Sequence, residues 1–161
     1  MQDKNLIFTR IDDRLIHGQV MTSWLRVYHD AKEVLVVDDE VAKDPFMTQM
    51  FGVLLPKGIG IEILNVDDAV AKFEKGLDTP TFMLVKFPLT IKRLVDAGVE
   101  IDHLNIGGMG MSGDRKKFYQ NIAASEEEKQ ILQELIDGGM KIEIQITAQK
   151  NKVDVASLLK K

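Results

Sequence analysis

The chain has 161 residues, 45% of them hydrophobic and 29% charged, which is the composition of an ordinary globular protein. We therefore expect one domain over residues 1–161. The formal net charge of −4 argues against nucleic acid as a partner, because nucleic-acid-binding domains are usually basic. The sequence has no cysteine and no run near the roughly 20 apolar residues that cross a bilayer, which excludes disulfides, thiolate chemistry and a membrane channel.

The first predicted elements are a strand, a charged turn and a helix. The apolar run Leu6–Phe8 predicts a buried strand, and residues 10–14 predict a turn. Apolar residues then recur at helical spacing from Val20 to Tyr28, which predicts an amphipathic helix. His17 and Gly18 lie where the turn becomes this helix.

The rest of the chain alternates between strand and helix patterns. Strands are expected at residues 33–37, 59–64, 81–87, 104–106 and 141–147, with a short strand near an edge at 118–123. Helices are expected at residues 41–55, 66–76, 88–98, 125–137 and 153–159. This alternation predicts an α/β fold with an open, mostly parallel sheet and helices on both faces. Ligands of such sheets bind outside the carboxyl ends of the strands, where His17 lies after the first strand.

The turn before the first helix combines residue types that bind and transfer phosphate. The first N–H groups of a helix lack partners within it, and the positive end of the helix dipole attracts anions. Arg10 and Arg14 add guanidinium groups that bind phosphate oxygens and favour the neutral form of His17. Neutral imidazole is a nucleophile. Gly18 leaves room for a phosphate to approach the backbone.

The neighbouring acidic residues have two interpretations. Asp12 or Asp13 could bond to one ring nitrogen of His17 and so fix the tautomer presented by the other. The pair is equally compatible with a helix cap that takes no part in chemistry. A single histidine between a strand and a helix is itself more often a solvated or capping residue than a catalyst.

Four segments of the chain resemble one known family. They are RIDDRLIHGQV followed by Trp24, VVDDEVAKDPFMTQMF, LVKFPLTIKRLVDAGVEIDHLNIGGM and LIDGGMKIEIQITAQKNKVDV. Their order and spacing are similar to those of the IIB subunit of the mannose/fructose/sorbose family of the bacterial phosphoenolpyruvate-dependent sugar phosphotransferase system. The resemblance covers nearly the whole chain, and its first motif is long and specific.

The resemblance implies a protein-N(π)-phosphohistidine–sugar phosphotransferase. His17 matches the phosphorylated histidine, whose Nδ1 is expected to carry the phosphate, and Arg14 matches the arginine that stabilises the phosphoryl group. Arg10, Asp12 and Asp13 match as well, without separately assigned roles. The resemblance also implies that the first strand is central and lies next to the second and the fourth, which would place His17 at the topological switch point.

The same resemblance implies the partners. The phosphoryl group comes from a phosphohistidine on IIA and passes to a sugar held by the membrane-embedded IIC and IID subunits. The protein is then cytoplasmic and associates with the inner face of the membrane through these subunits. The first strand lies near the start of the chain, and 161 residues leave no room for a second domain after this one. We therefore expect IIA on a separate chain or as a domain of one. We expect Met21 and the loop Met109–Met111 to form part of the docking surface around His17.

Two other features have weaker functional interpretations. Gly108–Gly113 matches G-x-G-x-x-G, which suggests as an alternative a dinucleotide-binding α/β enzyme, although no clear helix pattern follows. In the resembled family a glycine-rich segment lies near the active site here, so Gly107 and Gly108 are expected to shape it. Lys86 lies near the end of the fourth predicted strand, on the same rim as His17, where it either assists phosphate binding or is simply exposed.

Neither a cofactor nor a metal is predicted. The sequence lacks the G-x-x-x-x-G-K-[ST] loop that binds ATP, so a phosphoryl donor other than a nucleotide is easier to accommodate. His29 and His103 lack a second ligand at metal-binding spacing. Asp38–Glu40 favours a solvated helix cap over a Mg²⁺ site.

Overall fold

The computed structural model describes residues 2–160, apart from the side chain of Gln19. Within these residues the main sheet has seven strands in the order β3-β2-β4-β1-β5-β8-β9. Their bounds are β1 Leu6–Asp12, β2 Glu33–Val37, β3 Gly60–Leu64, β4 Thr81–Val85, β5 His103–Gly108, β8 Lys141–Ile144 and β9 Val153–Asp154. The strands pair in parallel except β8 and β9, which are antiparallel. The predicted α/β fold with a mostly parallel sheet is therefore confirmed.

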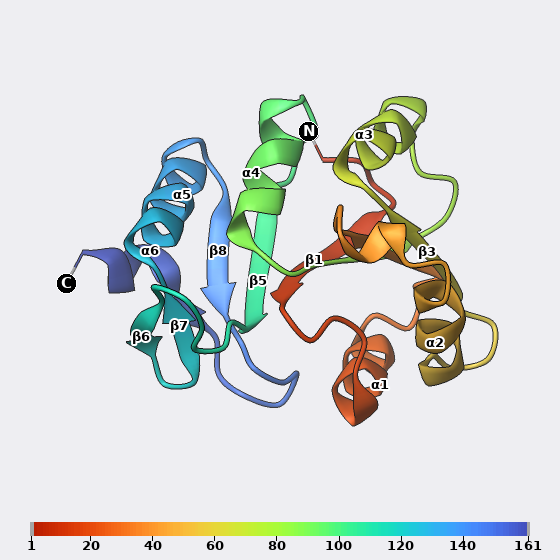
Figure 1. Ribbon diagram of the computed structural model, residues 1–161, viewed down its shortest axis with the longest axis horizontal. Coiled ribbons are helices and arrows are strands. Elements are labelled where there is room, and N and C mark those ends of the chain that lie inside the picture. The colour runs from red at the N-terminus through yellow and green to blue at the C-terminus, as the bar shows by residue number, and fades with distance from the viewer. Residues whose placement is uncertain (1, 161) are drawn as a thin grey trace.

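Helices cover both faces of this sheet (Figure 1). One face is covered by α1 (Gly18–Val27) and α2 (Met47–Leu54). The other is covered by α3 (Val66–Lys75), α4 (Pro88–Asp96), α5 (Glu126–Asp137) and α6 (Val155–Leu159). The chain runs toward the β3 edge through α1 and α2, and returns toward the β8 edge through α3, α4 and α5. Because such crossovers are right-handed, the two directions place their helices on opposite faces.

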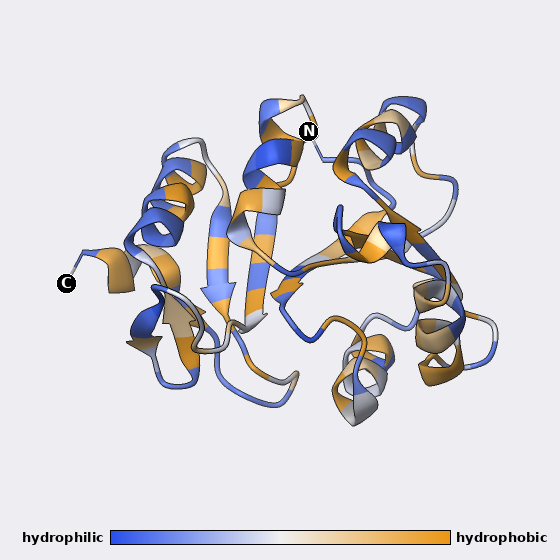
Figure 2. Cartoon of the chain, viewed as in Figure 1, coloured by the Kyte–Doolittle hydropathy of each residue, from blue (hydrophilic) through white to orange (hydrophobic). Residues whose placement is uncertain are grey.

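The burial of the strands follows their sequence patterns. Val34–Val37 are buried throughout, as expected for a strand that is covered on both faces. Along β8, Ile142 and Ile144 are buried while Lys141 is exposed, and Figure 2 shows this strand banded in orange and blue. The apolar strand residues therefore contribute to two cores, one beneath each helical layer.

The strand order corrects one expectation. β1 is central, the fourth of the seven strands in the described sheet, and β4 is its neighbour as expected. Its other neighbour is β5 and not β2, because the crossover through α1 passes over the position that β4 later fills. After β1 the chain passes toward the β3 edge of the sheet, and after β5 it passes toward the β8 edge. The topological switch point therefore lies between β1 and β5.

The helix expected at residues 41–55 is divided in two. A 3₁₀ turn, η1, spans Val41–Lys43, and α2 begins only at Met47. The break lies at Asp44, which is extended with φ −94° and ψ 110°. Pro45 explains the break, because a proline disfavours helical geometry in the residue before it.

Other boundaries also differ from the sequence-based expectations. The strand expected at 118–123 is an antiparallel hairpin, β6 (Lys116–Tyr119) and β7 (Ile122–Ala124), which forms a small sheet of its own. The helix expected from residue 153 begins at Val155, because Val153 and Asp154 pair with β8. The strand expected to end at 147 ends at Ile144. Where the sequence suggested a turn from residue 10, β1 continues to Asp12.

Candidate active site

His17 lies at the carboxyl end of the sheet, between β1 and α1. β1 ends at Asp12, and a tight turn follows in which the Leu15 N–H donates to the Asp12 carbonyl at 2.9 Å. Leu15 itself has a positive φ of 58°, a conformation that is uncommon for a residue other than glycine. His17 is the N-cap residue of α1, but its side chain does not cap the helix. The imidazole is therefore free to interact elsewhere, and 24% of the side-chain surface is exposed.

The imidazole is oriented by Asp12. Nε2 of His17 lies 3.0 Å from Oδ2 of Asp12, whose carboxylate is almost fully buried. An ionised carboxylate only accepts hydrogen bonds, so Nε2 carries the proton and Nδ1 has the free lone pair. Of the two carboxylates considered from the sequence, Asp12 is the one that fixes the tautomer.

Asp12 is held as a carboxylate by its surroundings. Oδ1 accepts hydrogen bonds from the backbone N–H and from Nε of Arg14, at 3.1 and 3.0 Å, and Oδ2 accepts one from Nη2 at 3.2 Å. Burial by itself raises the pKa of Asp12. Hydrogen bonds from Arg14 and His17, with the charge of Arg10, outweigh this effect and leave the pKa below its usual value.

Arg14 and Arg10 occupy different environments. The Arg14 side chain is 52% exposed and covers the buried carboxylate of Asp12 from the surface. Arg10 belongs to β1 and is only 1% exposed. Of the two guanidinium groups expected to bind phosphate, only that of Arg14 therefore lies at the surface. Burial lowers the pKa of Arg10 to about 10, against the opposing effect of Asp12, and the side chain stays charged at neutral pH.

Two glycines of β5 make room for these buried charges. A Cβ on Gly107 would lie 1.8 Å from Cζ of Arg10, and a Cβ on Gly108 would lie 2.4 Å from Oδ1 of Asp12. Both glycines are strand residues and not part of the loop in which the sequence pattern placed them. Their role is to let the Arg10 and Asp12 side chains lie directly against the backbone of the neighbouring strand.

Asp13 binds the loop after β5 instead of the histidine. Its Oδ2 accepts hydrogen bonds from the Gly110 N–H at 2.7 Å and from Nη1 of Arg115 at 3.3 Å. Arg115 also forms a bidentate pair with Glu128, with both distances 2.9 Å. Asp13 therefore ties the glycine-rich loop to the turn that carries His17.

Sequence reasoning missed Arg115 and Asn105, which are both buried. Arg115 stands in the charged run 114–117, which gives no sign that one of its members is enclosed. Asn105 accepts a hydrogen bond from Arg10 in the middle of β5. A polar residue between Leu104 and Ile106 in an otherwise apolar strand is a signal that could have identified it.

Gly18 and Lys86 lie at the same edge of the sheet. Gly18 has a φ of +43°, and a Cβ there would meet no atom within 4 Å, so space is open above the start of α1. Lys86 directly follows β4, the neighbour of β1, and its Nζ lies 5.5 Å from the centre of the Phe87 ring. Within the described residues Lys86 makes no hydrogen bond or ion pair.

The expected docking residues divide between core and surface. Met21 and Met109 are buried in the cores, so neither lines a docking surface. Met111 is 67% exposed, and Phe87 and Leu89 are also exposed near the carboxyl end of β4. These three side chains supply apolar surface on the rim that carries His17.

The alternative dinucleotide site is contradicted by the fold. The fingerprint requires a helix that opens directly after the glycines. Gly108 lies within β5, and the segment beyond Gly113 forms the hairpin β6–β7.

Three other candidate ligands that the sequence offered, Asp38, Asp39 and His103, are occupied in structural contacts. Asp38 accepts the backbone N–H groups of Glu40 and Val41, and Asp39 pairs with Arg93 at 2.7 Å. His103 lies 2.7 Å from a carboxylate oxygen of Glu143. Among residues 2–160, no group of three or more His, Cys, Asp or Glu side chains could hold a metal ion.

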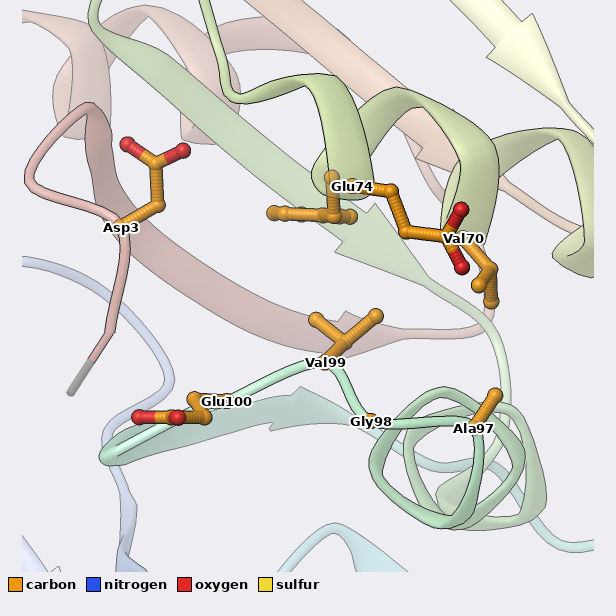
Figure 3. A pocket seen from close by; sticks show the side chains of 8 residues that line it. Asp3, Val70, Glu74, Ala97, Gly98, Val99 and Glu100 are labelled. Carbon is orange, nitrogen blue, oxygen red and sulfur yellow. The ribbon is translucent and has the colours of Figure 1, made fainter.

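A cavity of about 300 Å³ lies at the opposite end of the sheet, before β1 and β5 (Figure 3). The described residues lining it include the carboxylates of Asp3, Glu74 and Glu100 but no basic side chain. Oδ2 of Asp3 accepts the Leu77 N–H at 2.9 Å, so this carboxylate has a structural role. A phosphate would be repelled by this lining, so this cavity is not a candidate phosphate site.

The fold and the site together define a class of protein. It is a doubly wound α/β protein whose switch point carries a tautomer-fixed histidine beside an exposed arginine and the N-terminus of a helix. A family model described as "PTS system sorbose subfamily IIB component" matches residues 6–161. The chain therefore belongs to the IIB components of the sorbose subfamily of the phosphotransferase system.

Comparisons with individual proteins agree with this assignment. The sorbose-specific EIIB component of Klebsiella pneumoniae is 30% identical over 93% of this chain and 92% of its own. The mannose-specific EIIAB component of Escherichia coli K12 is 28% identical over 94% of this chain but only 47% of its own. The crystal structure of manxB from Thermoanaerobacter tengcongensis has a TM-score of 0.88 and 34% identity, and covers 97% of this chain and 95% of its own.

No helix among residues 2–160 is both long enough and apolar enough to span a membrane.

Proposed function

We propose that Nδ1 of His17 accepts a phosphoryl group from a phosphohistidine on a IIA protein and passes it to a sugar. The observation that carries this proposal is the 3.0 Å contact between Nε2 of His17 and Oδ2 of Asp12. It leaves Nδ1 as the nucleophile on a side chain that is 24% exposed. Membership of the IIB family supports the same reaction.

Each step is a displacement at phosphorus. In the first, the Nδ1 lone pair forms the new N–P bond while the N–P bond of the donor breaks, and that electron pair returns to the donor imidazole. The proton on Nε2 stays in place, so the phosphorylated ring gains a positive charge that the Asp12 carboxylate stabilises. In the second, a sugar hydroxyl oxygen attacks phosphorus, the Nδ1–P bond breaks with its pair returning to Nδ1, and the hydroxyl proton is released to a base.

The phosphoryl oxygens would be stabilised by charges on the same rim. Arg14 uses Nε and Nη2 on Asp12, while Nη1 makes no hydrogen bond within the described residues. The start of α1 adds N–H groups that no side chain of the N-cap residue occupies. Gly18 leaves the space above them open, and Lys86 brings a further cation to the rim. Transfer needs little beyond this alignment and charge stabilisation.

The proposed donor and acceptor are both other proteins of the system. We propose that IIA docks on the rim around His17, where Phe87, Leu89 and Met111 are exposed. The name of the mannose-specific relative, EIIAB, joins IIA and IIB and supports a direct exchange between the two. The acceptor is a sugar held by the membrane-embedded IIC and IID subunits. In this proposal residues 1–161 act as one cytoplasmic IIB domain at the inner face of the membrane, a transferase acting from phosphohistidine to sugar.

Label transfer from phosphoenolpyruvate through the general phosphocarrier proteins and IIA tests the proposal. The wild-type protein should take up one acid-labile phosphate, and His17→Ala should take up none. His103→Ala is the matched control, because His103 is also paired with a carboxylate but lies at the start of β5, away from the rim. Uptake of label by His17→Ala, or its loss in His103→Ala alone, would refute the assignment.

A further inference from the structure

We infer that Arg10 is a positioning residue, which holds the Asp12 carboxylate against His17 and does not bind the phosphoryl group. The inference rests on the proposed transfer at His17. It concerns Arg10, which the sequence alone would equally allow to bind the phosphoryl group. It is argued from the contacts of the Arg10 guanidinium, from its burial, and from the carboxylate oxygen that it shares with His17.

The guanidinium has no terminal N–H group left for a phosphate. Nη1 of Arg10 donates to Oδ1 of Asn105 at 2.6 Å and to the Gln145 carbonyl at 2.9 Å. Nη2 donates to Oδ2 of Asp12 at 3.3 Å and to the Ile146 carbonyl at 2.8 Å. The two terminal nitrogens carry four N–H groups, and all four point to acceptors within the protein.

The guanidinium is also enclosed. It lies so close to the backbone of Gly107 that a Cβ there would be 1.8 Å from Cζ, and Cζ is 5.1 Å from the centre of the Trp24 ring. A phosphate could reach it only by displacing this packing. Arg14, by contrast, is half-exposed and keeps Nη1 for a ligand.

The contact with Asp12 gives Arg10 its effect on the histidine. Oδ2 of Asp12 accepts from Nη2 of Arg10, from Nη2 of Arg14 and from Nε2 of His17, so Arg10 shares with His17 an oxygen that Arg14 also contacts from the surface. Asn105 fixes Arg10 from β5, and the carbonyls of Gln145 and Ile146 fix it from the end of β8. Contacts from the interior of the sheet thus fix Arg10, and Arg10 helps to fix the position of the Asp12 oxygen that binds the imidazole. Arg10 acts through Asp12 and touches no reacting atom.

A double-mutant cycle separates positioning from phosphate binding. Arg10→Lys keeps the charge but loses the planar fork. We expect it and Asp12→Asn each to slow phosphorylation of His17 by roughly tenfold or more. The double variant should be no slower than Asp12→Asn alone, because Arg10 acts through the carboxylate. A double variant that is slower by the product of the two effects would show that Arg10 acts on the phosphoryl group, and would overturn the inference.

The tautomer of unphosphorylated His17 gives a readout that needs no transfer reaction. In ¹⁵N spectra the wild-type ring should be protonated at Nε2, whereas Arg10→Lys should show a mixture of both tautomers. Asn105→Ala is the second variant, for use if Arg10→Lys does not fold. It removes one hydrogen-bond acceptor of Arg10 while the charge of Arg10 remains, and it should also produce a mixture of tautomers. Unchanged tautomers in a folded variant would contradict the inference. Failure of the wild-type protein to take up phosphate would instead refute the proposed function and leave this readout valid.

Discussion

Oδ2 of Asp12 lies 3.0 Å from Nε2 of His17, while the adjacent carboxylate of Asp13 points to the Gly110 N–H at 2.7 Å. Two consecutive acidic residues therefore serve two different parts of the corner. One fixes the proton on the imidazole and the other fixes the loop after β5. The separation coincides with the end of the strand, because Asp12 is the last residue of β1 and Asp13 is the first residue of the turn that follows.

Arg14→Ala should slow phosphorylation of His17 by about 100-fold, because it removes the exposed cation next to the Asp12 carboxylate that holds His17. The free energy of unfolding should fall by about 1–3 kcal/mol, since the half-exposed side chain also donates two hydrogen bonds to the buried Asp12 carboxylate. Rapid-quench labelling and urea unfolding measure the two effects. Arg26→Ala, at the far end of α1, is the matched control and should keep the wild-type rate. Equal rates for the two variants would exclude a role for Arg14 in transfer.

Gly107→Ala should be strongly destabilising. Its Cβ would lie 1.8 Å from Cζ of Arg10, and the buried guanidinium cannot move without losing its four hydrogen bonds. We expect a loss on the order of 3 kcal/mol in the free energy of unfolding. Gly110→Ala is the control, because its Cβ would lie at an ordinary 3.6 Å from Asp13. Urea denaturation of both variants decides the point, and equal stabilities would contradict the close packing of Arg10.

Asp13→Ala should loosen the glycine-rich loop without changing the histidine. It removes the acceptor of the Gly110 N–H, while Arg115 keeps its bidentate pair with Glu128. Hydrogen exchange at the Gly110 amide should accelerate by about tenfold, the effect of one charge-assisted hydrogen bond. The ¹⁵N shifts of His17 should stay at their wild-type values. Unchanged exchange at Gly110 would mean that Asp13 does not hold the loop.

The stabilising effect of Asp12 should disappear in acid. Its pKa is lower in the folded protein than in the unfolded chain. The stability that its carboxylate contributes is therefore complete above the unfolded pKa of about 3.9, and is lost as the pH falls through the lower folded value. At neutral pH the wild-type protein should exceed Asp12→Asn by about 3 kcal/mol in the free energy of unfolding.

That difference should shrink as the pH falls below about 4. The pKa values of Asp39, Glu128 and Asp154 are also lowered in the folded protein. Both proteins contain these groups, so their contribution cancels in the difference between wild type and Asp12→Asn. Urea unfolding of both proteins at a series of pH values measures it. A difference that stays constant across the series would show that the Asp12 carboxylate is not stabilised by folding.

The elements that place His17 could be predicted from the sequence because their signals are local. The apolar run of β1, the helical spacing from Val20 and the continuous apolar run of β2 each identify an element without reference to the rest of the chain. Together they locate the histidine at a strand-to-helix corner. The strong N-cap at Ser125 similarly identified the start of α5, where the capping box is formed with Glu128.

The interior of the site could not be predicted because it depends on contacts between distant segments. Arg10 looks like a turn residue until β5 and the end of β8 supply acceptors for it, 95 and 135 residues away. The roles of Gly107 and Gly108 likewise depend on what the neighbouring strand packs against them. The position of β2 beyond β4 is a property of the crossover, and no local pattern records it.

The position of the phosphoryl group on the ring tests the central claim most directly. The protein would be phosphorylated by its IIA with ¹⁵N-labelled histidine, and the nitrogen bonded to phosphorus identified by ¹H–¹⁵N and ³¹P spectra. The structure predicts a bond to Nδ1 of His17, with the proton kept on Nε2 toward Asp12. A phosphorus bond to Nε2, or to a nitrogen of His29 or His103, would contradict the account.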